Sequence, residues 1–91
     1  QEKSFFFRGP EAKLNLRAQN LGIFIQMAEG VDDETWLHHL HQHDYSRWIR
    51  SAIKDKKLAQ QIEQIESENS NAAESRKQII AAIEKQYTSA A

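Results

Sequence analysis

The sequence predicts an all-α fold, an irregular bundle of four to five short helices preceded by an extended aromatic N-terminal arm. Two observations lead to this prediction. The 91 residues contain only one proline and three glycines, so long stretches run without a helix breaker, and apolar residues recur at helical spacing. We expect a single domain over residues 1–91, with the arm at 1–10 and the helical bundle at 11–88.

The arm is predicted from three consecutive phenylalanines, Phe5, Phe6 and Phe7, which precede the break at Gly9-Pro10. A short aromatic run of this kind favours extended backbone. No other segment has comparable strand character, so we predict no partner strand. Because side chains alternate along extended backbone, one ring is expected to remain available for another domain or chain.

The first two helices follow from an apolar stripe and a cap. A helix is predicted over 11–28, with Gly30 ending it. Its apolar face has residues three or four apart: Leu14, Ala18, Leu21, Ile25 and Ala28. Asp32 and the acidic residues after it predict the start of a second helix, which carries Trp36 and ends near Gln42.

Three further helices are predicted from their N-caps. Asp44, Asp55 and the pair Asn71 and Glu74 have the residue types and positions of helix starts. The apolar faces are Tyr45, Trp48, Ile49, Ala52 and Ile53 in the third helix, Leu58, Ile62 and Ile65 in the fourth, and Ile79, Ile80, Ile83 and Tyr87 in the fifth. In the fourth helix, Glu63, Glu66 and Glu68 are expected to face water.

Composition excludes several classes of function. The chain has no cysteine and a net charge of −1, which excludes a disulfide framework, a thiolate nucleophile and a strongly basic nucleic-acid tail. Its longest apolar run, Leu21 to Met27, is far shorter than the roughly 20 residues that span a bilayer. We therefore expect a cytoplasmic protein that makes no membrane contact, and we expect no cofactor.

A histidine cluster raises the possibility of a metal site. His39 and His43 are four residues apart, so both imidazoles could reach one ion from the same face of a helix. A functional site needs further ligands, and the nearest carboxylate, Asp44, is assigned as a helix cap. The plain interpretation is a polar helix end, so no metal ligand is assigned and a metal-binding domain stays an alternative.

A basic helix face raises a second alternative. Arg47, Arg50, Lys54 and Lys57 follow at helical spacing, as in a helix-turn-helix domain that contacts nucleic acid. The isoelectric point near 6.5 and the acidic residues before this segment argue against nucleic acid, since they would repel phosphates. A solvated helix face is the simpler interpretation.

Polar and aromatic residues beside the apolar stripes form the remaining candidate site. We predict that a charge-assisted network fixes how the first three helices cross, and that the aromatic side chains belong to the core with one hydrogen-bond partner for each Trp and Tyr. The network candidates are Arg17, Asn20, His39, Asp44 and Arg47, and the aromatic candidates are Trp36, Tyr45 and Trp48. These residues carry either a structural role or an interaction surface.

The chain resembles a helical domain of unknown function associated with the C-terminal end of haloacid-dehalogenase-like hydrolases. The resemblance runs from Phe5 to Tyr87, and the stretches that carry it include Phe7 to Pro10, Leu14 to Leu21, Gly30 to Trp36 and Asp44 to Trp48. The superfamily's chemistry uses an Asp-x-Asp pair, which this chain lacks. The resemblance therefore implies an accessory role rather than catalysis, and of the four histidines its pattern shares only His39.

Together these observations predict a non-catalytic helical accessory or protein-interaction module in a bacterial cytoplasm. Its expected partner is a protein or the rest of its own larger chain, such as a hydrolase of the resembling class. A homodimer is a further expectation, because small helical domains often self-associate to bury remaining apolar surface. No catalytic motif is recognised, so an enzyme ranks last.

Overall fold

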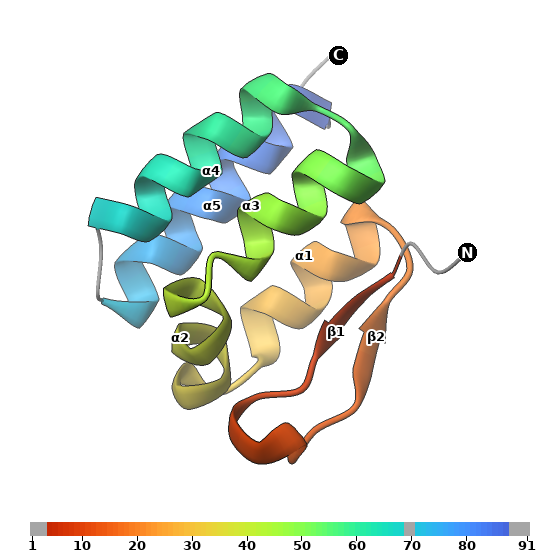
Figure 1. The fold of residues 1–91 in the computed structure, drawn as a ribbon, viewed down its shortest axis with the longest axis vertical. Helices are drawn as coiled ribbons and strands as arrows, with labels where there is room; N and C mark the ends of the chain where they lie inside the picture. The colour runs from red at the N-terminus through yellow and green to blue at the C-terminus, as the bar shows by residue number, and fades with distance from the viewer. Residues whose placement is uncertain (1–3, 69–70, 88–91) are drawn as a thin grey trace.

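The computed structural model describes residues 4–68 and 71–87, and it confirms the all-α fold class. Within these residues a small two-stranded hairpin packs against five α-helices (Figure 1). The helices are α1 (Leu21–Gly30), α2 (Asp33–His41), α3 (Asp44–Trp48), α4 (Lys56–Glu68) and α5 (Ala72–Tyr87). Helices α4 and α5 lie beside one another on one side, and the hairpin lies on the other side, along α1.

The N-terminal arm is one strand of the hairpin. Strand β1 (Phe5–Phe7) pairs antiparallel with β2 (Leu16–Ala18), with Phe6 opposite Arg17, and the short 3₁₀ turn η1 (Pro10–Ala12) lies between them. The predicted absence of a partner strand is therefore wrong, and so is the helical assignment of residues 11–20. Strands of three residues are too short for a clear alternation, so the spacing of Leu14 and Ala18 also fitted a helix.

Most helix starts lie where their capping residues predict. The side chains of Asp32, Asp55 and Asn71 accept hydrogen bonds from the backbone N–H three residues on, at 3.0, 3.0 and 2.8 Å. The side chain of Asn20 caps α1 in the same way, from Ile23 N–H at 2.9 Å. These bonds satisfy N–H groups that have no partner within the helix.

The start and end of the third helix differ from the prediction. His43, with a left-handed backbone at φ 58°, is the residue before α3, and Asp44 is the first residue of the helix. Asp44 does not act as the cap because its carboxylate is bonded to other side chains. After Trp48 the helix widens into the π-turn η2 (Ile49–Ile53), which closes with Lys54 N–H bonded to Ile49 O at 2.7 Å.

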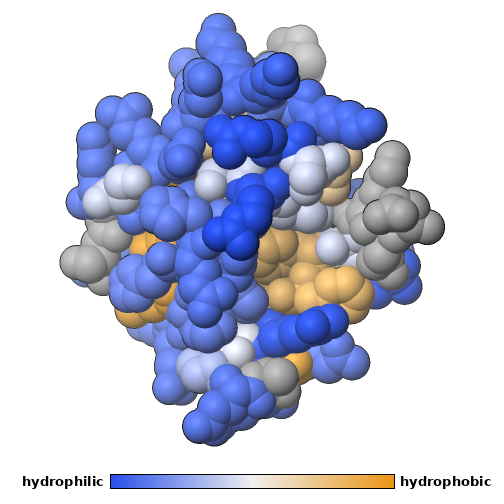
Figure 2. Space-filling view, viewed as in Figure 1, coloured by the Kyte–Doolittle hydropathy of each residue, from blue (hydrophilic) through white to orange (hydrophobic). Residues whose placement is uncertain are grey.

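The core has an aromatic half and an aliphatic half. The centroid of the Phe5 ring lies 4.8 to 5.5 Å from the ring centroids of Phe7, Phe24, Tyr45 and Trp48. These contacts join β1 to α1 and α3. The aliphatic half lies between α4 and α5 and contains Leu58, Ile62, Ile79 and Ile83. Figure 2 shows an apolar patch, framed by hydrophilic side chains, over the region where α1, α3 and β1 meet.

Glu66 of α4 is buried, with 4% of its surface exposed, so the prediction that it faces water is wrong. Its carboxylate accepts a hydrogen bond from Ser46 N–H at 3.1 Å and lies 3.2 Å from His43 Nδ1. Burial raises the pKa of Glu66, although both hydrogen bonds lower it. This carboxylate connects α4 to the first turn of α3.

Candidate functional site: a groove between the hairpin and α3

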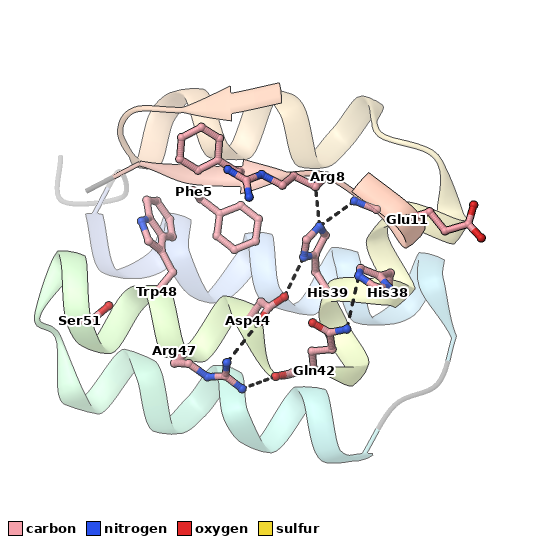
Figure 3. Close-up of a pocket in the computed structure, with 12 residues that line it drawn as sticks. Phe5, Arg8, Glu11, His38, His39, Gln42, Asp44, Arg47, Trp48 and Ser51 are labelled. Atoms are coloured by element: carbon pink, nitrogen blue, oxygen red, sulfur yellow. Dashed lines mark hydrogen bonds and ion pairs between the residues drawn. The ribbon is translucent and has the colours of Figure 1, made fainter. Parts of the chain in front are cut away.

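An open hollow of about 580 Å³ is lined by residues of the hairpin, α2 and α3, and we call it the hairpin groove. Figure 3 shows Arg8 on one side and Arg47 on the other, with Phe5, Trp48 and Asp44 between them. The remaining lining residues are Phe6, Gly9, Glu11, His38, His39, Gln42 and Ser51. Four of the eight predicted site residues therefore lie at one place: His39, Asp44, Arg47 and Trp48.

His39 connects the hairpin to α2 and α3. Its Nε2 accepts hydrogen bonds from the backbone N–H groups of Arg8 and Gly9, at 3.1 and 3.2 Å. Because Nε2 accepts, the ring proton belongs on Nδ1, which donates to Asp44 Oδ2 at 2.8 Å. Both ring nitrogens are thus engaged in holding three elements together.

The environment of His39 favours the neutral imidazole. The residue is only 6% exposed, and burial lowers its pKa, although the hydrogen bond to Asp44 and its charge raise it. A second ring proton would also point at two backbone N–H donors. In this arrangement His39 is a structural hydrogen-bonding residue, and its Nε2 lone pair is not available to remove a proton from a molecule in the groove.

Gly9 allows this close approach of the hairpin. Its backbone is left-handed at φ 74°, and a Cβ there would lie 2.8 Å from Thr35 Oγ1. Only glycine combines that backbone with that clearance. The turn after β1 can therefore rest directly on α2, with its amides facing His39.

Arg47 lies at the rim of the groove. Its guanidinium donates to Gln42 O at 2.6 Å and lies 3.6 Å from Asp44 Oδ1, while 70% of the side chain is exposed. Arg47, Asp44 and His39, three of the five predicted network residues, therefore form a connected chain of charge-assisted contacts. Arg17 and Asn20 are not part of it, because Arg17 donates to Ser4 Oγ at 2.8 Å and Asn20 caps α1.

The three predicted aromatic residues all belong to the core, and Trp48 also lines the groove. Trp36 Nε1 donates to Ser75 Oγ at 2.9 Å, and Tyr45 OH donates to the carbonyl of Trp36 at 2.9 Å. Both rings are fully buried and stack at 4.3 Å between centroids, which confirms the prediction of core residues with polar partners. Trp48 is 7% exposed and lines the groove.

The histidines do not converge on an ion site. His39 has both nitrogens occupied, and His43 faces Glu66 on the other side of α3. Over residues 4–68 and 71–87, no three His, Asp or Glu side chains are placed to hold a metal together. The i, i+4 spacing of His39 and His43 does not put them on one face, because α2 ends at His41 and His43 is left-handed.

Residues 9–91 match DUF5752, a family of unknown function. The chain belongs to this family. No curated protein and no solved structure matches it. The DUF5752 match covers the groove from Gly9 onward and attaches no activity to it, so the accessory role and the hydrolase association stay predictions.

The basic residues of this DUF5752 domain do not form one helix face. Lys54 is left-handed at φ 67° and separates η2 from α4, which carries Lys57. Arg50 lies 3.4 Å from Glu63. The predicted face depended on one continuous helix, and the break at Lys54 removes that basis.

Sequence reasoning missed the hairpin's contribution to the groove of the DUF5752 domain. The turn that follows β1 brings the amides of Arg8 and Gly9 to His39 of α2, and Phe6 lines the groove beside them. The Gly9-Pro10 turn was the available signal, since a glycine there permits a left-handed bend. In the described part of the domain, no helix is long and apolar enough to span a bilayer.

Proposed function

We propose that this DUF5752 domain is a non-catalytic protein-interaction module and that the hairpin groove is its binding surface. One observation carries the proposal: some polar residues of the groove hold the fold together, and others are open to a ligand. The titratable pair, His39 and Asp44, is used to hold the fold, whereas Arg8 and the mostly exposed Arg47 border an open hollow. Such a surface supplies charged groups for recognition, while the His39–Asp44 pair is committed to the fold and is not free to act as acid and base.

The resemblance to the C-terminal region of haloacid-dehalogenase-like hydrolases supports one class of partner. A hydrolase domain, on the same chain or another, would supply the catalytic groups, and this domain would bind or position it. The proposal places the domain in a bacterial cytoplasm as an accessory module.

A pull-down with matched baits tests the proposal. The baits are the native domain, Arg47→Glu at the groove rim and Arg50→Glu on η2, which makes the same charge change outside the groove. We expect a protein retained by the native and Arg50→Glu baits and lost with Arg47→Glu, while circular dichroism stays helical for all three.

Light scattering on the purified chain completes the test, because it separates self-association from binding of another protein. A partner that Arg47→Glu retains as well as the native bait would place the binding surface elsewhere. If the bait retains only nucleic acid at low salt, the proposal that the module binds a protein is wrong.

A further inference from the structure

We infer that the hairpin groove binds an acidic peptide segment with an apolar side chain; this deepens the proposed function and depends on it. Arg8 is the first reason. Its guanidinium lies 4.7 Å from the centre of the Phe6 ring, and it forms no ion pair with any other residue that the structure describes. A guanidinium held over a ring keeps its hydrogen-bond donors available for a carboxylate.

Arg47 adds a second cation on the opposite side. One of its terminal nitrogens is fixed by the carbonyl of Gln42 at 2.6 Å, which limits the orientations of the guanidinium. Its 3.6 Å contact with Asp44 is longer than a good charge-assisted hydrogen bond. An incoming carboxylate can therefore bind to Arg47 without breaking a strong ion pair.

The two acidic lining residues are less open to a ligand than the arginines. Asp44 is turned toward His39, to which its Oδ2 is bonded at 2.8 Å, and its side chain is 23% exposed, against 70% for Arg47. Glu11 points away from the groove in Figure 3. The groove therefore presents Arg8 and Arg47 to a ligand, whereas the chain as a whole has a net charge of −1.

The aromatic residues at the bottom of the groove, which we call its floor, determine the apolar part of the ligand. The small exposed parts of Phe5 and Trp48 lie between the two arginines (Figure 3), and the half-buried ring of Phe6, which packs against Arg8, also lines the groove. A volume of about 580 Å³ suits one or two side chains of a peptide better than a duplex, which needs a long charged surface. Aromatic floor and arginine rim together match a segment in which acidic and large apolar residues alternate.

Binding of two matched peptides tests this inference. One is a short fluorescein-labelled peptide of glutamate and phenylalanine, and the other has glutamine in place of each glutamate. We expect fluorescence anisotropy to show tighter binding of the acidic peptide, weakened by added salt. Arg8→Gln and Arg47→Gln are each expected to weaken it about tenfold, the loss of one charge-assisted contact, and Arg50→Gln is expected to leave it unchanged.

The two indole N–H resonances locate the bound peptide. Trp48 lines the groove and Trp36 is fully buried, so we expect the acidic peptide to shift the Trp48 signal and leave that of Trp36. A Trp48→Phe variant assigns the two signals.

Three outcomes overturn the inference in distinguishable ways. If both peptides bind equally and shift Trp48, the acidic preference is wrong but the groove remains an interaction surface. If neither peptide binds and the pull-down partner is also insensitive to Arg47→Glu, the proposed function fails with it. If random duplex displaces the acidic peptide and needs the same arginines, the ligand is nucleic acid.

Discussion

At the residue scale, His39 is a buried residue with both ring nitrogens hydrogen-bonded. Its imidazole joins the backbone of Arg8 and Gly9 to the carboxylate of Asp44, so one side chain satisfies two amides far away in the sequence. The spacing of the four histidines alone did not set His39 apart, although the family pattern shares only this one. His39 differs from the other histidines because β1 pairs with β2 and brings the hairpin turn to it. The residues next to His39 in the sequence do not indicate this long-range contact.

The lowered pKa of His39 predicts acid sensitivity. In the unfolded chain a histidine takes up a proton near pH 6.5, whereas the folded state resists protonation to a lower pH. The unfolded state then binds more protons, so the free energy of unfolding falls as pH drops below about 6.5. Urea unfolding between about pH 7.5 and 5 measures the slope.

His39→Gln is the matched variant for this measurement, since a glutamine offers an amide acceptor but does not titrate. We expect it to flatten the dependence of stability on pH over that range. An unchanged slope in the variant would assign the acid sensitivity to other groups.

Gly9 gives a second residue-scale prediction. Gly9→Ala introduces a Cβ 2.8 Å from Thr35 Oγ1 on a backbone at φ 74°, and we expect it to lower the free energy of unfolding by about 1–3 kcal/mol. Gly30→Ala is the control, because a Cβ at Gly30, the last residue of α1, meets nothing within 4 Å. It should leave stability unchanged or raise it slightly. Equal effects at both positions in urea melts would contradict the argument.

At the element scale, Glu66 shows how α4 fixes the start of α3. Its buried carboxylate faces Ser46 N–H and His43. Glu66→Ala leaves that N–H without an acceptor and opens a cavity, so we expect a loss of about 2–4 kcal/mol in urea unfolding. Glu63→Ala on the exposed side of the same helix is the control, with an expected change below about 0.5 kcal/mol.

Glu66→Gln separates charge from packing. Because burial raises the pKa of Glu66, the stability that its protonated form contributes is present below the ordinary value of about 4.5 and is lost as pH rises through the raised pKa. Glutamine keeps an acceptor without the charge. We therefore expect the variant to gain stability relative to the native chain between about pH 4 and 7; a relative loss would indicate that the ionised pair with His43 stabilises the fold.

An element could be predicted from the sequence when the residues that specify it are close together in the chain. The caps at Asp32, Asp55 and Asn71 are local, and the sequence alone places them. The hairpin depends on a pairing between residues 5 and 18, and short strands carry little periodicity. Glu66 was identifiable, since Leu58, Ile62 and Glu66 are four residues apart and share one face.

At the scale of the whole molecule, the aromatic half of the core makes the hairpin part of the bundle. Phe5→Ala removes the ring that contacts Phe7, Phe24, Tyr45 and Trp48, and we expect a loss of about 3–5 kcal/mol. That is a large share of the stability of a small domain. Phe6→Ala, next to it on the other side of β1, should cost far less in the same thermal or urea melt. Similar losses would show that the strand is held by pairing alone.

Several buried polar bonds of this small domain join residues far apart along the chain. His39 bonds to residues 30 and 31 positions earlier, and Trp36 bonds to Ser75, 39 positions later. Such contacts form only after long loops have closed, which slows folding relative to a bundle built from neighbouring helices. The amides of Arg8 and Gly9 reach their acceptor only when α2 is folded, so we expect the hairpin turn to complete its bonding after α2 has formed, although it comes earlier in the sequence.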